Sequence, residues 1–191
     1  MPKNVGGLLW SSKILCGLSV LFLSLPGYGV SLDVFPIDQT PRASDWRYFH
    51  DLPLAKQHEV WDGHARQGKT FKDWAWEWRL AWVRVCASTE ERWCRDMLQT
   101  ALFDKALVVR SEAALRIGQR YEGTANEDVT RLLIKAYQDP RNSRKGRPLF
   151  IQERILFALK SVGGSTAMDQ AKRLAGGHQT TQKYWGKIEK M

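Results

Sequence analysis

The sequence predicts an all-α protein, a short α-solenoid of antiparallel helix pairs, and three observations favour this class. Apolar residues recur at helical spacing from residue 54 to residue 175, and no segment alternates apolar and polar residues as a half-buried strand does. Capping residues and glycines divide this region into short helices. One apolar pattern also recurs along the chain, which is typical of stacked helix pairs.

The chain begins with the features of a secretory signal peptide. Lys3 and Lys13 flank a short basic region, residues 14–25 are apolar, and a motif with small residues ends at Gly29. An apolar run of about twelve residues is shorter than the roughly 20 residues that span a bilayer. We therefore expect residues 1–29 to be cleaved and the protein to be periplasmic or secreted, with an uncleaved anchor as the alternative.

The charge of the chain indicates which partners to consider. The formal net charge is +9, and removal of residues 1–29, which carry two lysines and no acids, leaves +7. A basic exported protein favours anionic partners such as lipid headgroups or acidic glycans, although the same charge also simply keeps a protein soluble. Nucleic acid is not an expected partner of an exported protein.

The remaining elements follow in chain order. Residues 30–53 contain three prolines and no helical periodicity, which predicts an extended lead-in. One helical domain is predicted over residues 54–177, followed by a polar tail over residues 178–191. The helices expected within the domain cover residues 54–66, 71–87, a segment beginning at Ser88 or Thr89, and residues 107–121, 126–138, 149–162 and 165–175.

Residues 71–87 are the most apolar of these helices. Trp74, Trp78 and Trp82 form one stripe, and Trp76 belongs to a second stripe, which Lys72 and Arg79 separate from the first on one side. A helix that is apolar over most of its circumference is buried by neighbours on at least two sides. Aromatic faces also stack on ligands, but the place of the first stripe in the repeat favours core packing, whereas Trp76 could face a groove.

The recurring pattern places three helices in register. Val109, Ala113 and Ile117 correspond to residues 35 positions earlier and 42 positions later, and the seven extra residues of the second step lie in a basic loop. The predicted repeat core is therefore Trp74, Trp78, Trp82, Val109, Ala113, Ile117, Ile151, Ile155 and Leu159.

Asp104 followed by Val109-Arg110, Ala113-Ala114 and Ile117-Gly118 resembles a HEAT-type repeat, and Asp139 begins a second, degraded copy. The resemblance covers residues 89–175, and Gln152 stands where its second copy should have arginine. It implies that Asp104, Arg110 and Asp139 help to tie successive repeats together. It implies little about function beyond a binding surface, because one fold serves many functions.

Two cysteines lie in the predicted domain. Cys86 ends the tryptophan helix and Cys94 lies near the start of the next helix. A disulfide between them would staple the two helices in an oxidising compartment, and two buried free thiols are the alternative.

Two further clusters are candidate sites. Arg141, Arg144, Lys145 and Arg147 lie within seven residues and could bind an anion, although such a loop is often merely solvated. His58 and His64 belong to the one cluster with catalytic residue types, but a gap of six turns their side chains about 120° apart on a helix. We therefore expect no metal site and no cofactor.

The functional hypothesis is an exported, non-catalytic binding or scaffold protein that presents a helical-repeat surface to a protein or peptide in the cell envelope. The alternative is electrostatic attachment to an anionic lipid or lipopolysaccharide surface through the loop at 141–147. A hydrolase that uses the segment at 58–64 is the least favoured hypothesis.

Overall fold

The computed structural model describes residue 35 and residues 37–191, so the predicted signal peptide and its cleavage site lie outside the described residues. The predicted all-α class is confirmed, because nearly all regular structure in this range is helical. The α-helices are α1 (Ala43–Asp51), α2 (Leu54–Arg66), α3 (Trp76–Ala87), α4 (Arg92–Ala101), α5 (Leu107–Arg120), α6 (Glu127–Tyr137), α7 (Phe150–Val162), α8 (Gly164–Ala175) and α9 (Gln179–Ile188). Shorter elements are the 3-10 helices η2 (Phe71–Asp73) and η3 (Pro140–Asn142) and the hairpin strands β1 (Ser143–Arg144) and β2 (Arg147–Pro148).

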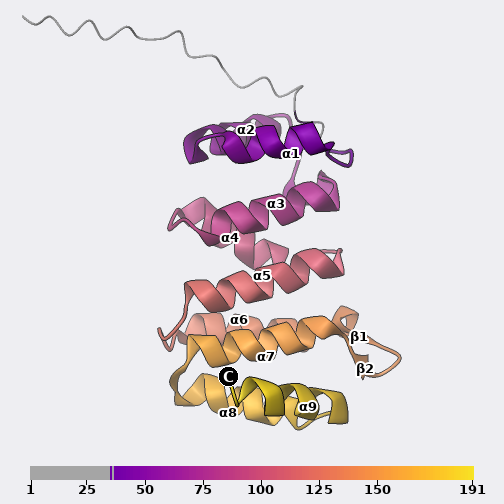
Figure 1. The fold of residues 1–191 in the computed structure, drawn as a ribbon, viewed down its shortest axis with the longest axis vertical. Coiled ribbons are helices and arrows are strands. Elements are labelled where there is room, and N and C mark those ends of the chain that lie inside the picture. Colours follow the sequence, from indigo (N-terminus) through magenta and orange to yellow (C-terminus); the bar gives the residue numbers. More distant parts are fainter. Residues whose placement is uncertain (1–34, 36) are drawn as a thin grey trace, which may run out of the picture.

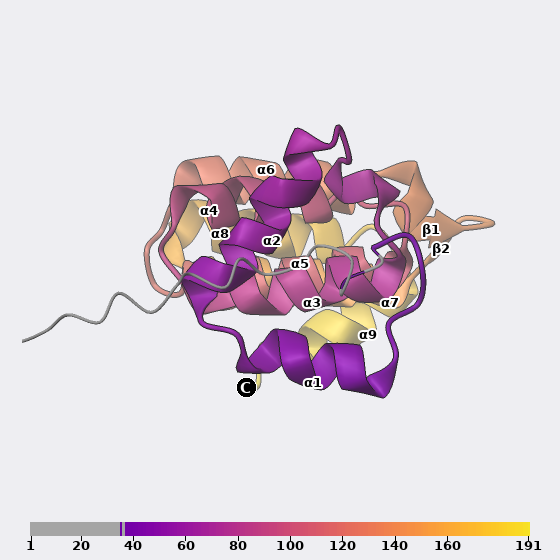
Figure 2. The same cartoon turned by 90° about the horizontal axis from the view of Figure 1, so that it is seen from above.

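The helices stack along the long axis of the molecule in three rows (Figures 1 and 2). The middle row consists of α3, α5 and α7, in which α5 packs against both of its neighbours. The back row consists of α2, α4, α6 and α8. The front row lies on the side of the middle row opposite to the back row (Figure 2). It contains α1 at one end of the stack and α9 at the other. The HEAT-type assignment and the solenoid geometry remain predictions.

Two end segments that lie outside the predicted helical domain are helical. Residues 43–51 of the predicted extended lead-in form α1, whose Phe49 is fully buried against Trp78 and Trp82. Residues 179–188 of the predicted polar tail form α9, which buries Trp185 and Ile188 and packs on α7. The prediction of an extended lead-in was therefore wrong over residues 43–51, and α9 was not predicted within the polar tail. Each helix has only a few apolar positions, too few to show a period, and is stabilised by tertiary burial.

The tryptophan helix is shorter than predicted and begins at Trp76. Thr70 caps the 3-10 turn η2, where its backbone N–H donates to Asp73 Oδ2 at 2.7 Å. The chain is then extended at Trp74 and Ala75, and Ala75 N–H donates to the Ile37 carbonyl. This break moves the repeat register by one helical turn, because α3 begins 31 residues before α5 rather than 35.

The nine predicted core residues are all buried, and the tryptophans among them lie in one aromatic cluster. Trp74, Trp78 and Trp82 are each at most 2% exposed and meet the rings of Phe35, Phe49, Trp61 and Trp93 at centroid distances of 5.0–5.8 Å. Most of these pairs are edge-on, the arrangement that aromatic quadrupoles favour. The cluster joins α1 and α2 to α3 and so completes the first end of the stack.

Candidate functional site

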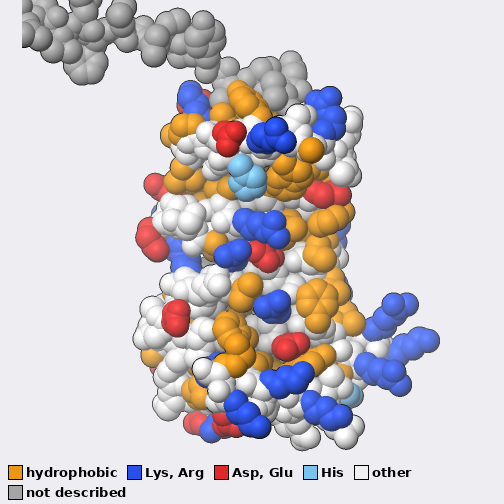
Figure 3. Space-filling view, viewed as in Figure 1, with side chains coloured by type: hydrophobic (Ala, Val, Ile, Leu, Met, Phe, Trp, Pro, Cys, Tyr) orange, Lys and Arg blue, Asp and Glu red, His pale blue; other side chains and the backbone are white. Residues whose placement is uncertain are grey.

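The middle row leaves part of its surface uncovered between α1 and α9, and we call this surface the front face. It carries Trp76, Val108 and Phe150, which are 44%, 42% and 43% exposed. Each lies in the first turn of its helix, on α3, α5 and α7 respectively. Because these helices stack in order, the three side chains belong to one side of the stack, where apolar surface is visible (Figure 3).

Two adjoining cavities hollow the front face. The first has a volume of about 350 Å³ and extends from Trp76 and Leu80 across Val108 to Phe150. The second has a volume of about 430 Å³ and extends from Leu115 and Phe157 to Ile188 and Met191. Phe150 and Arg154 line both. Concave, mostly apolar surfaces with a few polar groups are where proteins bind other molecules.

The charges of the front face are partly neutralised within it. Glu112 accepts from Arg84 at 3.4 Å and from Arg116 at 2.9 Å. Arg154 and Glu153 form no ion pair with any residue that the structure describes. Arg154 is exposed on the front face beside Phe150, so a partner can reach its guanidinium.

A buried polar ladder runs through the stack near the amino-terminal ends of α3 and α5. Arg79, which is 1% exposed, donates to both carboxylate oxygens of Asp104 at 2.7 and 2.9 Å. Arg110 donates to Asn142 Oδ1 at 2.8 Å and to the Asp104 carbonyl at 2.7 Å. Burial and the nearby Arg141 lower the pKa of the Arg110 guanidinium. These contacts tie each helix to the loop that precedes the next helix of the middle row.

The ladder corrects two sequence predictions. Arg79, predicted to separate the two apolar stripes, has the same role as Arg110, so Trp78 rather than Trp74 corresponds to Val109. Asp139 does not tie the repeats, because its carboxylate accepts from Arg141 two residues later and Asn142 meets Arg110 instead. The Arg141 hydrogen bonds lower the pKa of Asp139. The side chain of Gln152, in the position expected for arginine, donates to the Tyr137 carbonyl at 3.0 Å.

The four candidate cations at 141–147 are not equivalent. Arg141 is paired with Asp139. Arg144, Lys145 and Arg147 are exposed and form no ion pair with any described residue. They belong to the β1–β2 hairpin, which turns at Lys145 and Gly146 with φ values of 51° and 71°. Basic side chains project from this hairpin clear of the stack (Figure 3).

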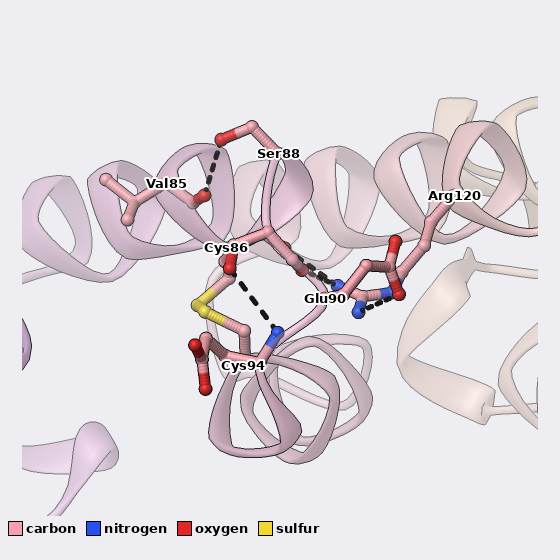
Figure 4. Close-up of a disulfide and its surroundings, with 8 residues drawn as sticks. Val85, Cys86, Ser88, Glu90, Cys94 and Arg120 are labelled. Carbon is pink, nitrogen blue, oxygen red and sulfur yellow. Dashed lines mark hydrogen bonds and ion pairs between the residues drawn. A yellow bond between two sulfur atoms is a disulfide. The ribbon is translucent and has the colours of Figure 1, made fainter. Parts of the chain in front are cut away.

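Cys86 and Cys94 form the predicted disulfide, with an S–S distance of 2.00 Å (Figure 4). The bond joins the end of α3 to the start of α4. Arg120 of α5 donates to the Cys86 carbonyl at 3.1 Å and pairs with Glu90 at 3.0 Å. The turn between the two helices is thus held both covalently and from the next helix of the stack.

The histidine segment of α2 does not form a convergent site. The His58 ring stacks on the Trp93 ring with a centroid distance of 4.5 Å, and His58 Nε2 lies 3.4 Å from Asp62 Oδ1. His64 is buried against Trp74, and this burial lowers its pKa. Within residue 35 and residues 37–191, no group of three or more potential metal ligands comes together.

Comparisons with protein-family models, with curated proteins and with solved structures each found no match to this chain. A search of the described residues found no helix with the length and hydropathy needed to cross a membrane.

The front face itself was only partly foreseeable from the sequence. The position of Trp76 on the second stripe indicated that it could face a groove. Val108 and Phe150 were missed, because the expected helix boundaries gave no reason to examine first turns. The signal that could have found them is the recurrence of a large apolar residue at the first or second position of each middle-row helix.

Proposed function

We propose that this chain is an exported, non-catalytic binding or scaffold protein and that its front face binds a helical segment of a protein or peptide partner. The observation that carries the proposal is the row of exposed Trp76, Val108 and Phe150 beside two adjoining cavities. Exposed apolar surface of this kind is characteristic of interaction sites, whereas single scattered apolar residues are not.

The geometry of the front row favours an amphipathic helix as the partner segment. The middle row already accepts two helices on this side, α1 through Phe49 and Trp46 and α9 through the contacts of its buried Trp185 and Ile188. A third helix between them would cover α5 and complete the front row. Helix-in-groove recognition uses apolar anchors at successive turns of the bound helix, and the aligned first turns present matching contacts.

Two observations support export. The amino-terminal sequence has the features of a signal peptide, and the Cys86–Cys94 disulfide is a bond that persists in oxidising compartments. The net positive charge would also suit the anionic environment of a cell envelope.

The test compares capture by the wild type with capture by Trp76→Glu/Val108→Glu. Both side chains are exposed, so the variant should fold, and a charge on each should oppose docking of an apolar helix face. We expect a partner captured from the envelope fraction and then purified to bind the double variant at least about tenfold more weakly, which is about 1.4 kcal/mol.

The matched control is Leu54→Glu, an exposed apolar residue on α2 outside the front face. Equal binding by the wild type and the double variant would contradict the proposal, as would equal loss in the control. A wild-type dimer that dissociates in the double variant would identify a second copy of this chain as the occupant and would also overturn the proposed partner.

The exposed β1–β2 hairpin favours a second candidate function, attachment to an anionic envelope surface. Arg144→Gln/Lys145→Gln/Arg147→Gln should lose sedimentation with phosphatidylglycerol vesicles, and wild-type binding should weaken as salt rises, because exposed charges are screened. Vesicle binding that is unchanged in the triple variant would contradict this candidate.

A further inference from the structure

A further cavity lies apart from the two cavities of the front face. Its volume is about 200 Å³, and it is lined by Phe71, Lys72, Thr100, Phe103, Asp104, Lys105 and Arg141. These residues come from η2, from the last turn of α4 and the segment that joins it to α5, and from η3. Three connections that are distant in sequence therefore contribute to one enclosure.

The charges around this cavity leave two cations without a partner. Asp104 is buried and bonded to Arg79, and Arg141 is paired with Asp139. Lys72 and Lys105 are exposed and form no ion pair with any residue in the described part of the chain.

One further carboxylate lies near Lys105. Asp73 lines a neighbouring cavity together with Lys105 and offsets part of the Lys105 charge, but it does not line this cavity. Among the residues that line the cavity and their ion-pair partners, the charges of Lys72 and Lys105 have no counter-ion, and a bound anion would balance them.

The walls of the cavity add apolar contact area. Phe71 is buried, and Phe103 is half-buried with the Lys135 ammonium 5.6 Å from its ring centroid. A volume of about 200 Å³ is several times the roughly 30 Å³ that one water occupies in the liquid. The space is thus sufficient for an anionic group together with part of the organic group that carries it.

We propose that this cavity binds a phosphate monoester, with Lys72 and Lys105 as its cationic ligands. A monoester carries a charge of about −1.5 to −2 at pH 7 and matches two ammonium groups, whereas a carboxylate carries one charge. Lysine binds phosphate as a point charge, while the planar fork of arginine binds either a carboxylate or a phosphate through two hydrogen bonds. The Arg141 fork is already occupied by a carboxylate, which leaves the lysines for phosphate.

The test uses calorimetric titration of the full chain with phenyl phosphate at an ionic strength of about 0.15 M, where the Debye length is about 8 Å. We expect Lys72→Gln/Lys105→Gln to weaken binding at least about tenfold, because both charges that face the phosphate are lost. The control Arg144→Gln/Lys145→Gln removes the same net charge from the hairpin and should change the affinity less than about twofold, because exposed distant charges are screened. Benzoate should bind the wild type at least about tenfold more weakly than phenyl phosphate.

A wild type that does not bind phenyl phosphate would overturn the proposal. Equal weakening in the two charge-matched variants would overturn it as well, since it would show only a general charge effect. Equal affinity for benzoate would reject phosphate as the ligand class. All variants replace exposed side chains, and unchanged thermal unfolding would verify that they are folded.

Vesicles that contain phosphatidic acid distinguish the two sources of a phosphate monoester. Retention of the wild type but not of Lys72→Gln/Lys105→Gln on these vesicles would assign a lipid headgroup. Binding of phenyl phosphate without vesicle retention would assign a soluble ester. Trp76 lines a neighbouring cavity together with Lys105, whereas Phe150 of the front face lines neither that cavity nor this one. Phe150→Glu should therefore weaken partner binding and still bind phenyl phosphate, so the two proposals can fail independently.

Discussion

Arg79 and Asp104 form an ion pair in which each side chain is 1% exposed. Arg79 also donates to the Trp74 carbonyl at the break before α3, and Asp104 accepts from the Ala106 backbone N–H at 2.7 Å. The pair therefore satisfies backbone groups at the starts of two middle-row helices. Such a pair need not stabilise the fold more than apolar residues would, but loss of one partner leaves a charge buried alone.

We predict that Asp104→Ala lowers the free energy of unfolding by about 3–5 kcal/mol, because it leaves the Arg79 guanidinium buried without a counter-ion. Urea denaturation of the purified protein measures this value. The control is Asp96→Ala, at an exposed position on α4, which should change stability by less than about 0.5 kcal/mol. A loss below about 1 kcal/mol for Asp104→Ala would contradict this account of the ladder.

At this scale the sequence identified some partners and missed others. Asp104 and Arg110 stood out because their spacing resembled a repeat motif. Arg79 was missed because the break at Trp74 and Ala75 shifts the first repeat by one turn, and an arginine in an apolar helix looks like a surface residue. Asp139 was assigned the wrong role because a local pairing with Arg141 competes with the inter-repeat contact.

At the scale of the elements, α5 and α7 approach most closely at Gly118. A Cβ added to Gly118 would lie 2.7 Å from the Ala158 Cα, a backbone atom that cannot move without displacing α7. Gly118 is therefore required for the packing of the two central helices, although glycine is otherwise unfavourable inside a helix.

We predict that Gly118→Ala destabilises the protein by about 1–3 kcal/mol, because overpacking outweighs the better helix propensity of alanine. Gly186 of α9 has no atom within 4 Å of an added Cβ, so Gly186→Ala is the matched control. It should stabilise the protein by up to about 1 kcal/mol. The two free energies of unfolding should thus change in opposite directions, and a stabilising Gly118→Ala would refute the close packing.

The helices that were predicted correctly are those with clear local signals in the sequence, such as capping residues and apolar periodicity. The predicted helices at 107–121, 126–138, 149–162 and 165–175 agree with the structure to within one residue at each end. Asn126, for example, accepts from the Val129 N–H at 3.0 Å as an N-cap does. The helices α1 and α9 were not predicted, since burial against other helices stabilises them and no period marks them.

At the scale of the whole molecule, the front row is incomplete. Helices α1 and α9 cover the two ends of the middle row, and α5 is uncovered between them (Figure 1). The sequence could not show this arrangement, because it depends on the register between helices that are distant along the chain. The exposed side chains of Trp76, Val108 and Phe150 form one continuous surface only when their helices are aligned.

The most direct measurement of the central claim is photocrosslinking in the native cell fraction from a benzophenone side chain placed at position 108. The same group at Arg131, an exposed position on α6 in the back row, serves as the control. The account predicts a discrete crosslinked partner from position 108 and none from position 131. No crosslink from position 108, or the same products from both positions, would contradict a binding role for the front face.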